Sequence, residues 1–141
     1  MRNKTERFPF SETQARGSLP YLPLKLSYQN NSADLIGILD TGASVSVLPY
    51  KVGKELGAVW ENQTVKLSLT GNLAQFEARA VILSAEIGQF SPVDLAFAWT
   101  RNENVPVILG QVNFFLEFDV CFFASEMFFE ISRKKKRKTK A

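Results

Sequence analysis

The chain has 141 residues, of which 45% are hydrophobic and 22% are charged, with one cysteine and no histidine. This length can bury one hydrophobic core but is short for two ordinary domains, and the composition is that of a folded globular protein. The absence of histidine excludes catalysis by a serine–histidine or cysteine–histidine pair. A single cysteine excludes an intrachain disulfide and a cysteine-rich metal site. Carboxylates must therefore carry any acid–base catalysis.

Charge is unevenly distributed along the chain. The formal net charge is +3, but residues 133–141 alone hold seven lysines and arginines, so the rest of the chain is mildly acidic. We expect residues 133–141 to be a disordered basic tail, and residues 1–18, which are polar and lack periodicity, to be a flexible N-terminal extension. One domain is predicted between them, over residues 19–132.

The sequence also bears on where the protein works. No apolar run approaches the roughly 20 residues that cross a bilayer, and the first residues lead into no apolar signal-peptide region. We therefore expect no membrane span and a cytoplasmic location.

The first half of the domain shows strand patterns and one helix pattern. Alternating apolar side chains predict a half-buried strand over residues 22–28, followed by a turn at residues 30–32. The uninterrupted apolar run at residues 35–39 predicts a strand that is buried on both faces. Proline suits a first helical turn and glycine a helix end, so Pro49 and Gly57 bracket a predicted short helix.

The second half adds further short strands and a second short helix. Strands are predicted over residues 64–69, 76–83, 93–98, 105–109, 120–123 and 128–131. The first two flank Thr-Gly-Asn at residues 70–72, which suits a tight turn and predicts a projecting hairpin. Residues 111–118 predict about two turns of helix. Many short strands with one or two short helices indicate an all-β, barrel-like single domain.

Two motifs point to one family. Residues 38–43, Ile-Leu-Asp-Thr-Gly-Ala, resemble the active-site signature of retropepsins, the retroviral branch of the pepsin-like aspartic proteases. Residues 107–110, Val-Ile-Leu-Gly, resemble the second signature of that family, and the predicted hairpin lies where the family has its flap. The resemblance covers approximately residues 19–131 and is closest to prokaryotic single-domain retropepsin-like proteins.

This resemblance implies a retropepsin-like acid protease barrel that functions as a homodimer with two-fold symmetry. It implies that Asp40 is the catalytic residue and that Thr41 hydrogen-bonds across the dimer. The residues that it implies as active-site support are Thr41, Gly42, Ala43, Leu109 and Gly110. The residues that it implies as the substrate-binding flap are Leu69, Thr70, Gly71, Asn72 and Leu73. Strands near both termini, at residues 22–28 and 128–131, would interleave in the dimer interface.

The chemistry of the first motif explains why a dimer is needed. Hydrolysis of a peptide bond by this route requires one general acid and one general base, and two neighbouring carboxylates provide both by sharing a proton. Only one Asp-Thr-Gly occurs, so the second carboxylate comes most simply from another copy of the chain. Asp34, Asp94 and Asp119 are followed by neither Thr-Gly nor Ser-Gly, and we interpret them as surface residues.

The sequence therefore predicts an aspartic endopeptidase that hydrolyses peptide bonds, with water activated between two Asp40 carboxylates and a preference for apolar residues around the scissile bond. Neither a metal ion nor a cofactor is required. Gln111 stands where retroviral enzymes usually have arginine, and Gly71 is the only glycine near the predicted flap tip. Phe8-Pro9 is a candidate bond for self-processing, and Cys121 is expected to be a buried, inert thiol.

Two alternative functions remain open. The same fold could serve as a noncatalytic dimeric module that binds peptides or partner proteins while retaining Asp40. The basic tail could contact nucleic acid through nonspecific charge, but a solvated end explains it at least as well, so nucleic acid is not an expected partner.

Overall fold

The computed structural model describes residues 4–13 and 17–135. It is mostly β, with two short α-helices, α1 (Tyr50–Glu55) and α2 (Phe114–Glu117), and three 3₁₀ turns, η1 (Trp60–Asn62), η2 (Gly71–Gln75) and η3 (Ala124–Glu126). The strands are β1 (Thr5–Pro9), β2 (Ser11–Thr13), β3 (Gly17–Leu19), β4 (Tyr21–Tyr28), β5 (Asn31–Leu39), β6 (Val47–Pro49), β7 (Lys66–Leu67), β8 (Ala78–Glu86), β9 (Val93–Thr100), β10 (Val107–Leu109), β11 (Phe118–Phe123) and β12 (Phe128–Arg133). The predicted all-β fold is confirmed. Within the part of the chain that is described, no helix is long and apolar enough to cross a membrane.

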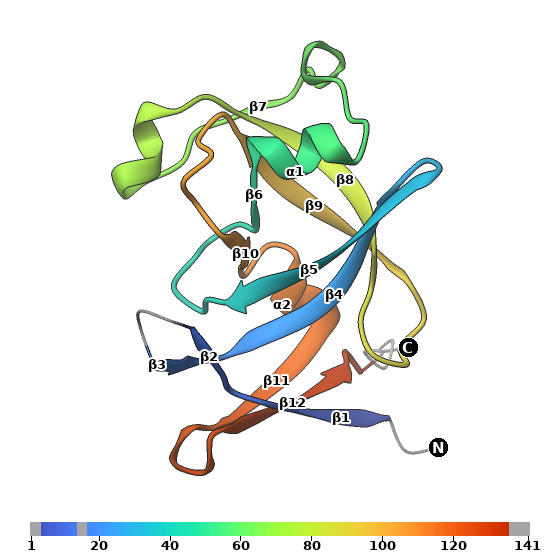
Figure 1. Ribbon diagram of the computed structural model, residues 1–141, viewed down its shortest axis with the longest axis vertical. Coiled ribbons are helices and arrows are strands. Elements are labelled where there is room, and N and C mark those ends of the chain that lie inside the picture. Colours follow the sequence, from blue (N-terminus) through green and yellow to red (C-terminus); the bar gives the residue numbers. More distant parts are fainter. Residues whose placement is uncertain (1–3, 14–16, 136–141) are drawn as a thin grey trace, which may run out of the picture.

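A seven-stranded sheet forms the body of the molecule. Its strand order is β4-β5-β10-β6-β9-β8-β7, and a further pairing of β4 with β8 closes the sheet into a barrel (Figure 1). The two longest antiparallel pairs are β4 with β5 and β8 with β9. β10, in contrast, runs parallel to β5. The parallel β10 lies beside the end of β5, where the first sequence motif begins.

Alternating side chains fill the barrel. Leu22, Leu24 and Leu26 of β4 are at most 4% exposed, as the period of two predicts. The prediction that β5 is buried on both faces was wrong, because Ile36 is 59% exposed. Only one face of β5 points into the barrel, and the burial of its residues alternates accordingly. The helix predicted between Pro49 and Gly57 is confirmed as α1.

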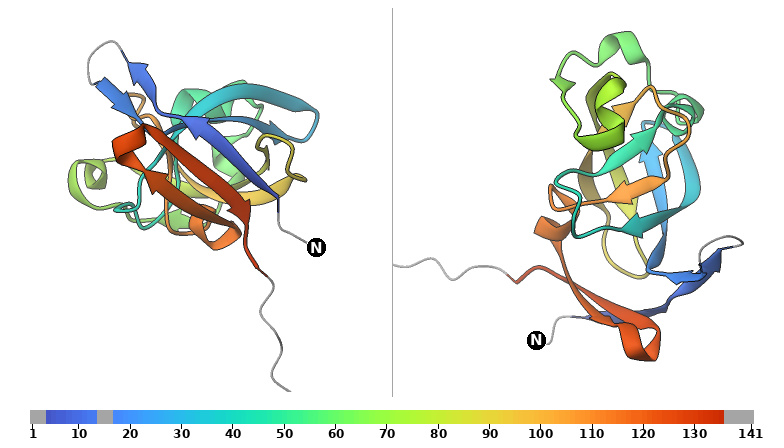
Figure 2. Two further views of the ribbon diagram at one scale, coloured as in Figure 1. Left: turned by 90° about the horizontal axis from the view of Figure 1, so that it is seen from below. Right: turned by 90° about the vertical axis from the view of Figure 1, so that its left-hand side faces the viewer.

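A separate three-stranded sheet, in the order β1-β12-β11, lies at one end of the barrel (Figures 1 and 2). Residues 5–9, expected to belong to a flexible extension, form β1 here and pair antiparallel with β12. Apolar packing holds β1 in this position, because the Phe8 ring stacks on the buried Phe129 ring with centroids 5.5 Å apart. The Phe8-Pro9 bond therefore lies inside a paired strand.

The C-terminal strands also differ in part from expectation. Cys121 is exposed on β11 and not buried, because it lies on the same face of this strand as the exposed Asp119 and Phe123. Arg133 ends β12 and forms an ion pair with Glu117 at 3.7 Å. Residues 136–141 of the predicted basic tail lie outside the described residues.

Candidate active site

Asp40 follows β5 directly, and its backbone is fixed by β10. The parallel register places Gly37–Leu39 beside Val107–Leu109. One residue further on, the Asp40 N–H donates to the Leu109 carbonyl oxygen at 3.0 Å. The expected support of the Asp40 loop by Leu109 thus has a specific form, a backbone hydrogen bond from the strand that runs alongside.

The loop after β5 orients the Asp40 carboxylate. The Gly42 N–H donates to Asp40 Oδ1 at 2.9 Å, and the Ala43 N–H donates to the Asp40 backbone oxygen at 3.1 Å. A Cβ on residue 42 would lie 3.3 Å from the same carboxylate oxygen, so glycine leaves room for this contact. Asp40 is exposed, and its carboxylate is available to another molecule.

Gly110 lies against the same loop at close range. A Cβ at this position would meet the Val45 carbonyl group and would lie 2.8 Å from the Ala43 carbonyl oxygen. Both are backbone atoms, which cannot turn aside as a side chain does. The predicted supporting role of Gly110 therefore has a steric basis: only a residue without a side chain lets the two segments approach this closely.

Backbone hydrogen bonds join the loop after β5 to the residues that follow Gly110. The Gln111 and Val112 N–H groups donate to the carbonyl oxygens of Ala43 and Ser44, each at 2.9 Å. The Ser46 N–H donates back to the Val112 carbonyl oxygen at 2.9 Å. The loop after β5 is thereby joined to the segment after β10 at several successive residues.

Two side chains complete the support. Gln111 Nε2 donates to the Thr41 carbonyl oxygen at 2.8 Å, so the residue that stands in place of the usual arginine binds the loop of its own chain. The buried Ser46 hydroxyl oxygen accepts the Gly110 N–H at 3.1 Å. Sequence reasoning missed Ser46, because a serine between two valines carries no signal of this role.

The segment between β7 and β8 differs from the predicted hairpin. Strand pairing stops at Leu67 and Ala78, and residues 71–75 form η2 instead of a tight turn at residues 70–72. Gly71 begins this turn at φ +63°, a conformation that suits glycine and directs the chain into η2. Residues 68–77, named here the covering segment, lie on the same side of the barrel as the Asp40 loop (Figures 1 and 2).

A cavity of about 170 Å³ separates the Asp40 loop from the covering segment. Three of the predicted flap residues line it, namely Leu69, Thr70 and Leu73, together with Ser68. Gly71 is not part of the lining, and the side chain of Asn72 lies outside the described residues. Asp40 is the only carboxylate among the lining residues, so the described chain brings one acidic group to this cavity.

The other aspartates lie elsewhere. Asp34 lines a separate cavity of about 510 Å³ together with Lys25 and Glu86. Asp94 lies on β9 and Asp119 on β11. No group of three or more histidine, cysteine, aspartate or glutamate side chains that could hold a metal ion occurs among the residues described.

Comparison with known proteins identifies the family. The aspartyl protease family matches residues 26–112, a stretch that holds both the Asp40 loop and Gly110. The chain belongs to the aspartyl protease family.

Solved structures agree with this assignment. The fold is similar to that of a retropepsin-like aspartic protease from Rickettsia conorii, with 14% identity over 94% of this chain and 95% of that chain and a TM-score of 0.64. It is also similar to the EIAV protease in complex with the inhibitor HBY-793, with 18% identity over 71% of this chain and 88% of that chain and a TM-score of 0.50. The fold is therefore retropepsin-like, as the sequence motifs predict. No curated protein matches the chain.

The Ser46 hydrogen bond can be tested by substitution. Ser46→Ala leaves the buried Gly110 N–H without its acceptor, and an unsatisfied buried donor costs about 1–3 kcal/mol. We expect the free energy of unfolding, measured by denaturant titration, to fall by that amount. Ser44→Ala is the matched control, because Ser44 is exposed in the same loop. An equal loss in both variants would contradict the role of Ser46.

Proposed function

We propose that this protein is an aspartic endopeptidase whose active site is completed by a second copy of the chain. One observation carries the proposal. The cavity beneath the covering segment contains a single carboxylate, Asp40, which is exposed and held by backbone hydrogen bonds from Gly42 and to Leu109. Acid–base hydrolysis of a peptide bond needs two such groups.

A two-fold axis beside the Asp40 loop would supply the second carboxylate. Two carboxylates a few ångström apart do not both ionise, so the pair would hold one proton. The ionised Asp40 would take a proton from the attacking water while the protonated partner donates to the carbonyl oxygen of the scissile bond. Proton transfer to the amide nitrogen would then release the amine, and no covalent intermediate is needed.

The cavity lining favours apolar side chains in the substrate. Val47 and Ile108 lie on the barrel side of the cavity and Leu69 and Leu73 on the covering side. Apolar pockets discriminate weakly between similar aliphatic side chains. We therefore propose extended peptides with apolar residues around the scissile bond as substrates.

The free sheet edges indicate where the second copy binds. β12, one strand expected in the interface, already has β1 on one side and β11 on the other. The other expected strand, β4, lies between β5 and, over part of its length, β8. Neither is free along its whole length to pair with another chain, so we consider the two edges of the three-stranded sheet, on β1 and on β11.

These two edges differ in character. β1 contains Glu6, Arg7 and Pro9, the kinds of residue that prevent a strand edge from pairing with another chain. β11, Phe-Asp-Val-Cys-Phe-Phe, contains neither lysine nor proline and has one charge, Asp119. We assign the open edge of β11 to an antiparallel pairing with β11 of a second copy, which strand pairing about a two-fold axis produces.

Exposed apolar side chains support this choice. Half of the exposed large hydrophobic residues of the described chain fall between residues 112 and 127, in the region from the Asp40 support to the end of the β11–β12 hairpin. These five residues are Val112, Leu116, Phe122, Phe123 and Met127. Phe122 and Phe123 lie on β11 itself and Met127 in the turn that follows, and exposed apolar side chains along one strand are typical of an interaction surface.

Replacing the proposed catalytic group tests the activity. Asp40→Asn removes both the acid and the base from a dimeric site, and we expect cleavage of a diverse peptide library to fall by at least about a thousandfold. The dimer, measured by sedimentation, should persist. Asp34→Asn is the control, because Asp34 lies on β5, the strand that precedes Asp40, and lines a different cavity. Absence of cleavage by a dimeric wild-type protein would favour the noncatalytic binding module instead.

The single cysteine tests the proposed interface. In an antiparallel pairing centred near Cys121, the two thiols lie within roughly 8 Å of each other, which a short bismaleimide can span. We expect this reagent to produce a covalent dimer, necessarily through Cys121 of both copies. We expect Cys121→Lys to weaken the dimer, because it places like charges opposite each other.

The control for this substitution is Thr5→Lys on the edge of β1, which should leave the dimer unchanged. A dimer that resists cross-linking and tolerates Cys121→Lys would show that the copies associate through another surface. The proposal for Asp40 does not depend on that outcome.

A further inference from the structure

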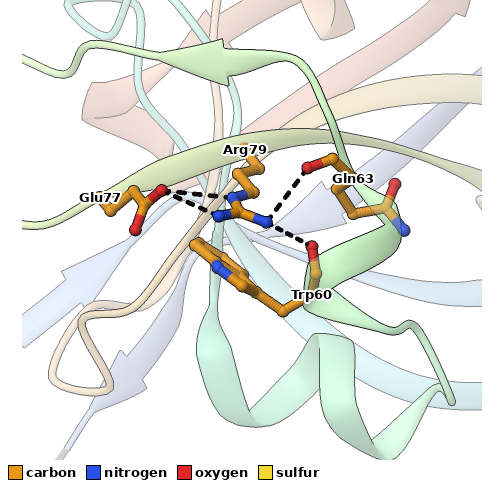
Figure 3. Close-up of polar contacts among 4 residues, drawn as sticks. All are labelled: Trp60, Gln63, Glu77 and Arg79. Atoms are coloured by element: carbon orange, nitrogen blue, oxygen red, sulfur yellow. Dashed lines mark hydrogen bonds and ion pairs between the residues drawn. The ribbon is translucent and has the colours of Figure 1, made fainter.

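One arginine side chain joins the chain that precedes β7 to the end of the covering segment. Arg79 Nη1 donates to the Trp60 carbonyl oxygen at 2.8 Å and to the Gln63 carbonyl oxygen at 3.3 Å. Its Nε and Nη2 donate to Glu77 Oε1 at 3.3 and 3.1 Å. Figure 3 shows the guanidinium between Glu77 on one side and Trp60 and Gln63 on the other.

The partners of Arg79 lie before the covering segment along the chain and at its last residue. Trp60 and Gln63 precede β7, which leads into the covering segment, and Glu77 is the last residue of that segment. β7 has only two residues, so its ladder with β8 is short. The Arg79 side chain therefore holds the chain before β7 against the start of β8, where the backbone pairing is short.

The guanidinium rests on the core of the protein. Its Cζ lies 4.7 Å from the centroid of the Trp60 ring, and Trp60 is 3% exposed. The Trp60 ring packs edge-on against buried Trp99 with centroids 5.1 Å apart. The Arg79 side chain is only 18% exposed, whereas Glu77 is 43% exposed, so solvent screens the ion pair between them.

A second arginine reinforces the same point. The Arg101 Cζ also lies 4.7 Å from the Trp60 ring centroid. Its backbone N–H donates to the Glu77 carbonyl oxygen at 3.0 Å. Glu77 is thus held through its side chain by Arg79 and through its backbone by Arg101, which fixes the place where the covering segment rejoins the barrel.

We propose that Arg79 is a positioning residue that sets the covering segment over Asp40 and thereby determines how tightly the protein binds its peptide substrate. The inference rests on the proposed function, and it adds a residue remote from the cavity lining to the parts that the reaction needs. Arg79 does not touch the substrate; it acts through Leu69, Thr70 and Leu73, which line the cavity.

Guanidinium geometry is essential to this role. Arg79 donates in several fixed directions at once, to two carbonyl groups and to a carboxylate, whereas lysine is a point charge on a flexible stem. Arg79→Lys keeps the charge but loses this fork. Glu77→Gln keeps an acceptor for one hydrogen bond and removes the ion pair, and it leaves the contacts of Arg79 with Trp60 and Gln63 in place.

The experiment measures amide hydrogen exchange and steady-state kinetics on the full chain. For Arg79→Lys we expect exchange across residues 68–77 to accelerate about tenfold, while β9 keeps its protection. We expect the KM for peptide substrates to rise about tenfold with kcat changed by less than about twofold, the pattern of a lost binding interaction. Glu77→Gln should show the same pattern with a smaller amplitude.

Glu61→Gln is the matched control, because Glu61 lies in η1 beside Trp60 and is exposed. It should change neither exchange nor KM. Unchanged exchange over residues 68–77 in both test variants would overturn the proposal, as would faster exchange without a rise in KM. If Arg79→Lys loosens the whole barrel, Glu77→Gln decides the question. Amide hydrogen exchange does not require activity. It therefore tests whether Arg79 holds the covering segment even if the wild type fails to cleave peptides.

Discussion

The close backbone approach at Gly110 is the constraint on which the rest of the site depends. Asp40 lies on an exposed loop, and surface loops are ordinarily the more mobile parts of a domain. Here the loop is joined to β10 and to the segment after it by hydrogen bonds at Asp40, Ser46 and Gln111. A side chain at Gly110 would separate the two segments. A carboxylate can therefore be both exposed to substrate and held in a fixed direction.

Under the proposed function, this support provides half of a catalytic site. The contacts that orient Asp40 come from its own chain, but the described residues bring no second acidic group to the cavity. The proposed two-fold pairing supplies it, and the terminal sheet limits how that pairing can form. Because β1 covers one side of β12, the N-terminal strand leaves β11 as the edge suited to a second copy. The covering segment lies on the other side of this cavity, and its last residue, Glu77, is held by Arg79.

Local patterns predicted the parts of the fold that local sequence determines. The alternation in β4, the bounds of α1, and the strand that ends at Asp40 all follow from side chains that are near one another in sequence. Contacts between residues that are distant in sequence could not be predicted from these local patterns. Phe8 packs against Phe129, which lies at the other end of the chain, so local sequence carries no signal of β1. The covering segment depends likewise on Arg79, whose partners Trp60 and Gln63 precede it by 19 and 16 residues.

The residues that support the site also fall into two groups, those that sequence motifs predict and those that only the packed structure defines. Asp40, Leu109 and Gly110 carry motif signals, and the structure places them in contact. Ser46 acts through a buried hydrogen bond that only the packed structure defines. The exposure of Cys121 and Ile36 reflects which strand face or edge is covered, and periodicity alone does not determine that.

The most direct test of the central claim, that each active site needs Asp40 from two chains, is the activity of mixtures of wild-type and Asp40→Ala protein after subunit exchange. With total protein constant, a site built from two chains makes activity follow the square of the wild-type fraction, about one quarter in an equal mixture. Activity proportional to that fraction, about one half in an equal mixture, would show that a single chain suffices and would contradict the account.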